Sequence, residues 1–146
     1  MREYEDLFEQ VERMIHKYNQ RENIRYKYGV EDLLTQTEIH LIAAIGAEPG
    51  IGVKKLAQKK GVTDGAVSQM IHKLVNKGLV AKRISSVSEA KIELTLTERG
   101  LICFTEHQKY HADKNIKWCN LFNRLDDKSY NEFIRLFQEI EKELDH

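Results

Sequence analysis

The sequence has little of what linkers, disulfide frameworks and membrane spans require. It contains one proline, eight glycines and two cysteines, Cys103 and Cys119, which share no motif spacing. These counts argue against low-complexity linkers and a disulfide-stapled fold, and no stretch approaches the roughly 20 apolar residues of a membrane span. The charged N-terminus, MREYEDLFEQ, lacks the apolar run of a signal peptide. A chain of 146 residues is therefore expected to be a compact, mostly helical, cytoplasmic protein with reduced thiols.

Net charge is also absent, because 23 basic residues balance 23 acidic ones. The average hides an asymmetry: residues 52–91 carry nine basic and two acidic residues, a net charge of +7, and the remainder carries −7. A basic segment of this kind attracts phosphate, but a solvated lysine-rich face has the same composition. The charge by itself leaves both interpretations open.

Apolar residues at helical spacing predict a long amphipathic helix at each end of the chain. The first begins near Tyr4 and is expected to continue to about Tyr26. The last follows the start signal Asp126 and Asp127 and continues to about Leu144. Since neither helix has a partner within its own hairpin, the two indicate a dimer interface, and packing within one chain remains the alternative.

The middle of the chain predicts a helix-turn-helix followed by a β-hairpin. Thr35 or Thr37 can cap a helix that runs to about Gly46. In VKKLAQKKGVTDGAVSQMIHKLVNKG, Gly61 supplies a turn between two helices. The second of these helices is expected to bury Val67, Met70, Ile71 and Leu74. Residues 79–84 and 91–96 then predict two strands about the polar tip SSVSEA, and Thr97 caps a helix that runs to about Phe122.

LAQKKGVTDGAVSQMIHKLVNKGLVAKR, followed by a hairpin and LTERG, resembles the MarR family of winged-helix transcriptional regulators. The resemblance implies a mainly α fold with a small β-hairpin wing (an α+β winged helix-turn-helix), and long terminal helices that form a homodimer. It implies an N-terminal dimerisation helix (1–34), a DNA-binding lobe (35–98) and C-terminal helices that complete the dimerisation region (99–146). The expected partner is double-stranded DNA with a pseudo-palindromic operator, without a membrane.

The second helix of the motif leaves polar residues opposite its core stripe. Gln69 could pair with adenine, Ser68 could reach a base or a phosphate, and Lys73 could contact a phosphate. Each of them alone could equally be an ordinary exposed residue. The hairpin departs from the family pattern, in which an arginine enters the minor groove: the sequence has Ser88, Glu89 and Ala90 there, and Lys91 is the nearest cation. The residues expected to contact DNA are Thr63, Asp64, Gly65, Ser68, Gln69, His72, Lys73, Ser85, Ser86, Ser88 and Lys91.

The stretch EHQKYH places His107 and His111 one helical turn apart, the spacing with which two imidazoles bind one cation. Such a pair alone is equally consistent with two exposed polar residues. The chain is also similar to the zinc-responsive branch of the MarR family, in which a glutamate late in the first helix and a histidine in the second complete the site. Glu22 and His40 stand in register with them. The resemblance therefore implies a metal site of Glu22, His40, His107 and His111, with Zn²⁺ first and other divalent transition metals open. It would act as a corepressor by joining the dimer helices to the DNA-reading lobe.

Other functions stay open at this point. A MarR-type regulator without a metal could be released from DNA by a phenolic or other small organic ligand, in a pocket lined by Arg21, Arg25, Tyr26, Tyr28 and Trp118. A redox switch at Cys103 would need a cationic neighbour that lowers the thiol pKa. An enzyme is not expected, because Gln108 stands where a zinc hydrolase of the HExxH type has its glutamate base.

Overall fold

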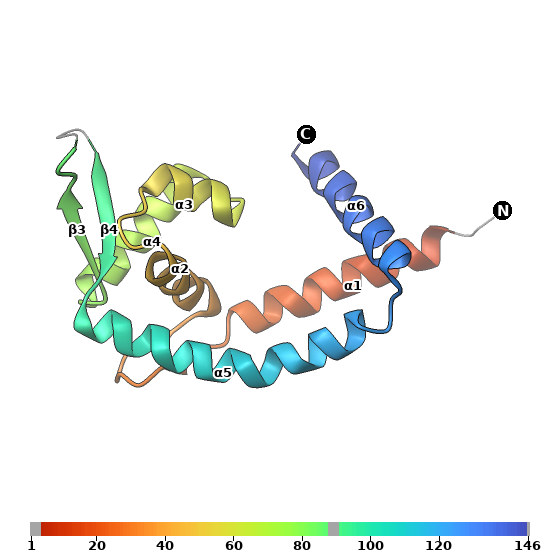
Figure 1. Cartoon of the computed structure of the whole chain (residues 1–146), viewed down its shortest axis with the longest axis horizontal. Helices are drawn as coiled ribbons and strands as arrows, with labels where there is room; N and C mark the ends of the chain where they lie inside the picture. Colours follow the sequence, from red (N-terminus) through yellow and green to blue (C-terminus); the bar gives the residue numbers. More distant parts are fainter. Residues whose placement is uncertain (1–3, 88–90, 146) are drawn as a thin grey trace. The chain divides into compact units, whose positions relative to one another are not determined.

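The structure is a computed structural model that describes residues 4–87 and 91–145, without the side chains of Glu22 and Asp113. Figure 1 shows the elements in chain order: α1 (Tyr4–Glu22), β1 (Tyr26–Lys27), β2 (Leu33–Leu34), α2 (Gln36–Ala47), α3 (Val53–Lys60), α4 (Asp64–Asn76), β3 (Val80–Ile84), β4 (Ile92–Leu96), α5 (Glu98–Phe122) and α6 (Asp127–Leu144). The chain divides into two compact units, Met1–His107 and Gln108–His146, and α5 continues through the boundary. The predicted mainly α fold with a small β-hairpin is confirmed.

Helix starts follow the capping residues in the sequence. The Thr35 hydroxyl accepts a hydrogen bond from the Glu38 N–H (3.2 Å), and the Glu38 carboxylate accepts one from the Thr35 N–H (3.0 Å), a complete capping box for α2. The Asp126 carboxylate accepts from the Ser129 N–H (2.7 Å), and this bond lowers the pKa of Asp126. Both helix starts were predicted, and both are confirmed.

The first helix ends earlier than predicted. α1 stops at Glu22 rather than near Tyr26, and the chain then forms the short β1–β2 hairpin, in which Tyr26 pairs with Leu34. Gly29 in its loop has a positive φ of 74°, and a Cβ there would lie 2.7 Å from a methyl carbon of Ile102 and 2.9 Å from Cγ of Glu106. The hairpin therefore packs against α5, a tertiary contact that helical periodicity in the sequence does not contain.

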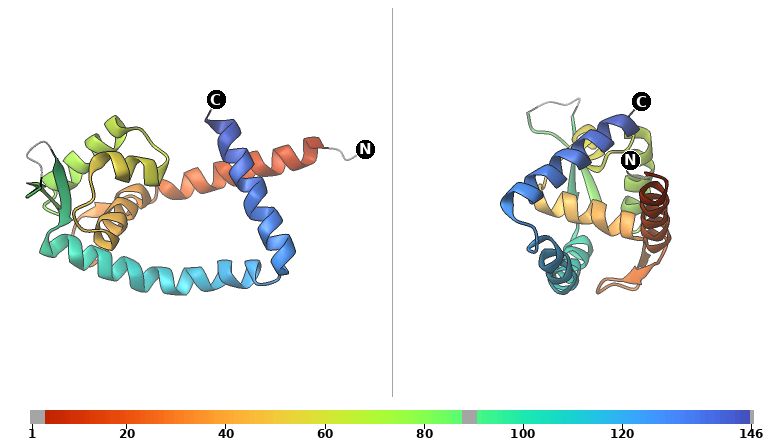
Figure 2. Two further views of the ribbon diagram at one scale, coloured as in Figure 1. Left: turned by 45° about the horizontal axis from the view of Figure 1, so that its top comes forward. Right: turned by 90° about the vertical axis from the view of Figure 1, so that its right-hand side faces the viewer.

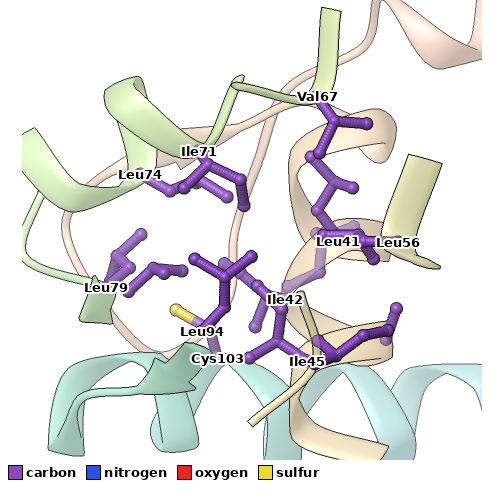
Figure 3. Close-up of a cluster of buried hydrophobic side chains, with 14 of the residues drawn as sticks. Leu41, Ile42, Ile45, Leu56, Val67, Ile71, Leu74, Leu79, Leu94 and Cys103 are labelled. Atoms are coloured by element: carbon purple, nitrogen blue, oxygen red, sulfur yellow. The ribbon is translucent and has the colours of Figure 1, made fainter. Parts of the chain in front are cut away.

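The hydrophobic core lies within the first unit, between α2, α3, α4 and the β3–β4 hairpin; we call these four elements the lobe. Figure 3 shows side chains of the three helices and the hairpin meeting in this core, and Cys103 joins them from the first turns of α5. The side chains labelled there are at most 1% exposed. The predicted stripe on α4 is confirmed for Val67, Ile71 and Leu74, whereas Met70 is only partly buried. The hairpin lies beside the lobe helices in both views of Figure 2. Its two strands pair antiparallel, in a register that runs from Val80 opposite Leu96 to Ile84 opposite Ile92.

The second unit is built on aromatic contacts between the end of α5 and α6. Ring centroids lie 6.2 Å apart for Trp118 and Phe122, 5.9 Å for Phe122 and Phe133, and 4.7 Å for Phe133 and Phe137. Other apolar side chains of α6 stay exposed, as do those of α1 in the first unit. Among the described helices, none has the length and apolarity needed to cross a membrane.

Candidate metal centre and nucleic-acid interface

Three histidines meet where α2 approaches α5. The ring centroids of His40, on α2, and His107, on α5, lie 5.5 Å apart with the planes inclined at 66°. His111 follows His107 by one turn of the continuous helix α5. One ligand nitrogen from each of the three residues can be chosen so that all lie within 4.8 Å of one another. The structure therefore brings together residues that are 71 positions apart in the chain.

The surroundings hold His107 in a defined orientation. Its side chain is 6% exposed, and the ring of Tyr28, also 6% exposed, meets it edge-on with 5.8 Å between centroids. Tyr28 precedes Gly29, the residue that lets the β1–β2 loop approach α5. His40 is placed by its neighbours on α2, because Ile39 and Leu41 are buried in the core. Packing thus holds the ring of His107 and places His40 on the side of α2 that faces it.

The donor set suits zinc. Zinc binds imidazole nitrogen at about 2.0–2.1 Å in a tetrahedral arrangement, which requires ligand nitrogens about 3.3 Å apart. Nitrogens already within 4.8 Å of one another reach that spacing through small side-chain rotations. Glu22, the fourth expected ligand, is the last residue of α1, but its side chain lies outside the described part of the chain, so its role remains a prediction.

The face of α4 opposite the core carries the residues expected to contact DNA. Thr63 is the N-cap and its hydroxyl accepts from the Ala66 N–H at 3.2 Å. This threonine is exposed, as are the expected contact residues of α4, which are Asp64, Gly65, Ser68, Gln69, His72 and Lys73. The structure thus presents one polar surface on the second helix of the motif.

The hairpin presents fewer of its expected residues. Ser86 and Lys91 are exposed, and Ser88 lies outside the described residues. Ser85 is only 6% exposed, and its hydroxyl accepts a hydrogen bond from the Val87 N–H at 3.2 Å. In this structure Ser85 shapes the hairpin, and its hydroxyl is not on the exposed surface.

A polar network that the sequence did not indicate links the end of α4 to both helices with histidines. The Lys77 ammonium donates to the carboxylate of Glu38 on α2 at 3.2 Å. Arg99, in the first turn of α5, donates to the Lys77 carbonyl oxygen at 2.6 Å and also to Asp32. In the sequence, Arg99 of LTERG was the only sign of this network, and residue spacing cannot show which carbonyl oxygen its side chain reaches. The network sets the position of α4 relative to α2 and α5.

The alternative sites find less support in the geometry. A cleft of about 350 Å³ lies between α1, α2 and α4, and Arg25 is the one residue lining it of the five expected around an organic ligand. Among the described residues that line this cleft, Met70 is the one apolar side chain, so the cleft offers little apolar surface to a phenolic ring. Tyr28 instead belongs to the core. Burial raises the pKa of the Cys103 thiol, and the nearby Arg99 only partly offsets this, so a reactive thiolate is disfavoured.

Comparison with known proteins agrees with this architecture. Residues 34–88, which span the start of α2 to the hairpin, match the sequence model described as the MarR family. Residues 34–88 thus carry the MarR-family signature. The chain is 26% identical over 114 residues to the HTH-type transcriptional regulator YhjH of Bacillus subtilis, covering 78% of this chain and 65% of that one. The resemblance read from the sequence is confirmed, and this relative is named as a regulator rather than an enzyme.

Solved structures of MarR-family members superpose on nearly the whole chain. The zinc-responsive ZitR of Lactococcus lactis shares 18% identity with a TM-score of 0.69, over 97% of this chain and 99% of that one. ZitR in complex with DNA reaches a TM-score of 0.72 at 19% identity, over 99% of each chain. The adhesin competence repressor AdcR of Streptococcus pyogenes reaches 0.74 at 18% identity over 100% of each. At these identities the likeness establishes the fold.

Proposed function

We propose that this MarR-family protein is a DNA-binding transcriptional repressor whose affinity for DNA is set by one divalent metal ion, with zinc as first choice. The observation that supports the metal is the convergence of His40, His107 and His111, whose ligand atoms lie within 4.8 Å of one another. The zinc-responsive ZitR, with the same fold, adds support. A protein that acts on the chromosome would work in the cytoplasm.

The exposed surface of the lobe supports DNA as the partner. The exposed residues of α4 include Gln69, which can form two hydrogen bonds with adenine, and Lys73, which can neutralise a phosphate. Segment 52–91, which contains α3, α4 and the hairpin strand β3, carries the net charge of +7. A duplex is the ligand whose charge and groove chemistry match both features.

Residues His40, His107 and His111 would hold the metal, and Glu22 is proposed as the fourth ligand. The ion would crosslink α2 to α5 through coordination bonds, which are stronger than a side-chain hydrogen bond between the same helices. α2 packs on α4, and Lys77 at the end of α4 is bound to Glu38 of α2. Fixing α2 against α5 would therefore reduce the range of orientations that α4 can adopt when it enters a major groove.

The exposed apolar faces of α1 and α6 support the proposed homodimer. Phe8 of α1 is 67% exposed and Phe137 of α6 is 52% exposed in the single chain. Large apolar side chains exposed along one helix mark an interaction site. A second copy of the same chain covers such faces symmetrically, and two lobes then suit a pseudo-palindromic operator.

Replacement of Phe8 by aspartate is expected to convert the dimer to a monomer, because a charge would be buried in the apolar interface. Sedimentation equilibrium of parent and variant measures the change. Glu9→Gln, on the neighbouring exposed position, is the matched control and should stay dimeric. A variant that remains a dimer would place the interface elsewhere.

Zinc is expected to tighten binding to DNA from the region upstream of the protein's own gene about tenfold or more, within the usual range of allosteric coupling. Fluorescence anisotropy with a labelled duplex, with and without Zn²⁺ and at several salt concentrations, measures it. By linkage, the duplex should raise the affinity for zinc by the same factor, which calorimetry can check independently.

The same titration separates the two kinds of effector. If zinc leaves the DNA affinity unchanged while a phenolic acid weakens it, the metal proposal is wrong and the organic effector is correct. If the duplex does not bind under any of these conditions, even at low salt where phosphate contacts are strongest, DNA binding itself is refuted.

A further inference from the structure

The outer end of the β3–β4 hairpin carries apolar side chains on its surface. Ile84 is 68% exposed and Ile92 is 49% exposed, and the two lie opposite each other in the register of the strands. Val87, just beyond Ile84, is 93% exposed. Aliphatic side chains clustered at the end of an exposed hairpin favour contact with a partner.

The hairpin backbone holds these side chains in place. The Ser85 N–H donates to the Lys91 carbonyl oxygen at 2.8 Å, and this bond extends the pairing beyond Ile84 and Ile92. Ile92 and the fully buried Leu94 are two residues apart on β4, so they lie on the same face of the hairpin. The isoleucine pair therefore continues the core face of the hairpin past the edge of the core.

Cations surround this apolar edge. Lys82 and Lys91 are exposed on the two strands, whereas Arg83, the arginine of the hairpin, donates to Glu93 at 3.1 Å. Val87 and Ile92 also line an open cleft of about 810 Å³ between the hairpin and the start of α3. The charged residues that line this cleft are Lys54, Lys55, Lys91, Glu48 and Glu93, so lysines outnumber carboxylates there. An apolar strip flanked by lysines matches a nucleic-acid groove, in which sugars and base edges lie between two rows of phosphates.

We propose that Ile84 and Ile92 contact the floor of the DNA minor groove and select against guanine beneath the hairpin. This inference rests on the proposed DNA binding. In the minor groove, a G·C pair differs from an A·T pair chiefly by the guanine 2-amino donor. An isoleucine side chain cannot accept a hydrogen bond, so it would leave that donor buried without a partner. The chain would thus obtain sequence preference at the hairpin without an inserted arginine.

Base analogues test the inference, because they change the minor groove and leave the major-groove hydrogen-bonding pattern intact. The probe is the upstream duplex, prepared with inosine in place of guanine or with 2,6-diaminopurine in place of adenine. Inosine lacks the 2-amino group and diaminopurine adds it. We expect the inosine duplex to bind about fivefold more tightly than the parent duplex, and the diaminopurine duplex about fivefold more weakly.

The double variant Ile84→Ser and Ile92→Ser should bind all three duplexes within about twofold of one another, because the hydroxyl groups can accept from the amino donor. Lys82→Ala is the control and should weaken all three equally through loss of a phosphate contact. Thermal melting confirms that both variants are folded. If the double variant still distinguishes the three duplexes, the inference is wrong. It is also wrong if the double variant binds DNA like the parent and only its self-association changes, because the isoleucines would then contact a second copy of the chain. If the parent protein binds no duplex at all, both this inference and the proposed DNA-binding function are wrong.

Discussion

Replacing His107 by alanine is expected to lower the affinity for zinc at least about 100-fold, since even the loss of a group that only orients a metal ligand costs about 10- to 100-fold. His107 is the central member of the cluster: it is buried, it lies 5.5 Å from His40 between ring centroids, and it precedes His111 by one turn. Isothermal titration calorimetry with a competing chelator measures the affinity.

His16→Ala is the matched control, because His16 is an exposed histidine on α1 that contacts Gln20 and lies outside the cluster. It should bind zinc like the parent protein. The DNA affinity of His107→Ala should match that of the parent without zinc and should no longer respond to the metal. A His107→Ala protein that binds zinc like the parent would refute the proposed ligand set, whatever its DNA affinity.

Gly100→Ala is expected to destabilise the protein by about 3 kcal/mol, near the upper end for overpacking. Gly100 lies in the first turns of α5, where a Cβ would overlap the carbonyl oxygen of Leu79 and lie 3.1 Å from the carbonyl carbon. The obstacle is backbone at the start of the hairpin, which cannot rotate away as a side chain would. Thermal unfolding at fixed protein concentration should show a midpoint lower by about 6 to 12 °C.

Gly65→Ala provides the opposite case within the same lobe. Gly65 lies in the first turn of α4 with an ordinary φ, and a Cβ there would meet no atom within 4 Å. Alanine has a higher helix propensity than glycine, so this variant should be as stable as the parent or more stable, by up to about 1 kcal/mol. If the two substitutions had equal effects on stability, the contact with Leu79 would not be what requires glycine at position 100.

Much of the fold could be predicted because its signals are local. Helix caps such as Thr35 and Asp126 use hydrogen bonds within four residues, and the apolar spacing of α4 repeats over its own length. The β1–β2 hairpin could not be predicted in the same way. Its formation depends on Gly29 lying against Ile102, more than 70 positions along the chain.

The sequence by itself determined the helix-turn-helix, the hairpin and the histidine pair on one helix, because each rests on periodicity, capping or spacing along a single segment. It also carried the resemblance to the MarR family, which rests on the residues of that segment. Only the tertiary structure decided that His40 meets that pair, that Arg99 ties the end of α4 to the start of α5, and that Ser85 turns inward while Ile84 turns outward. These outcomes depend on how separate elements pack, and packing is set by the shapes of surfaces that are distant in the chain.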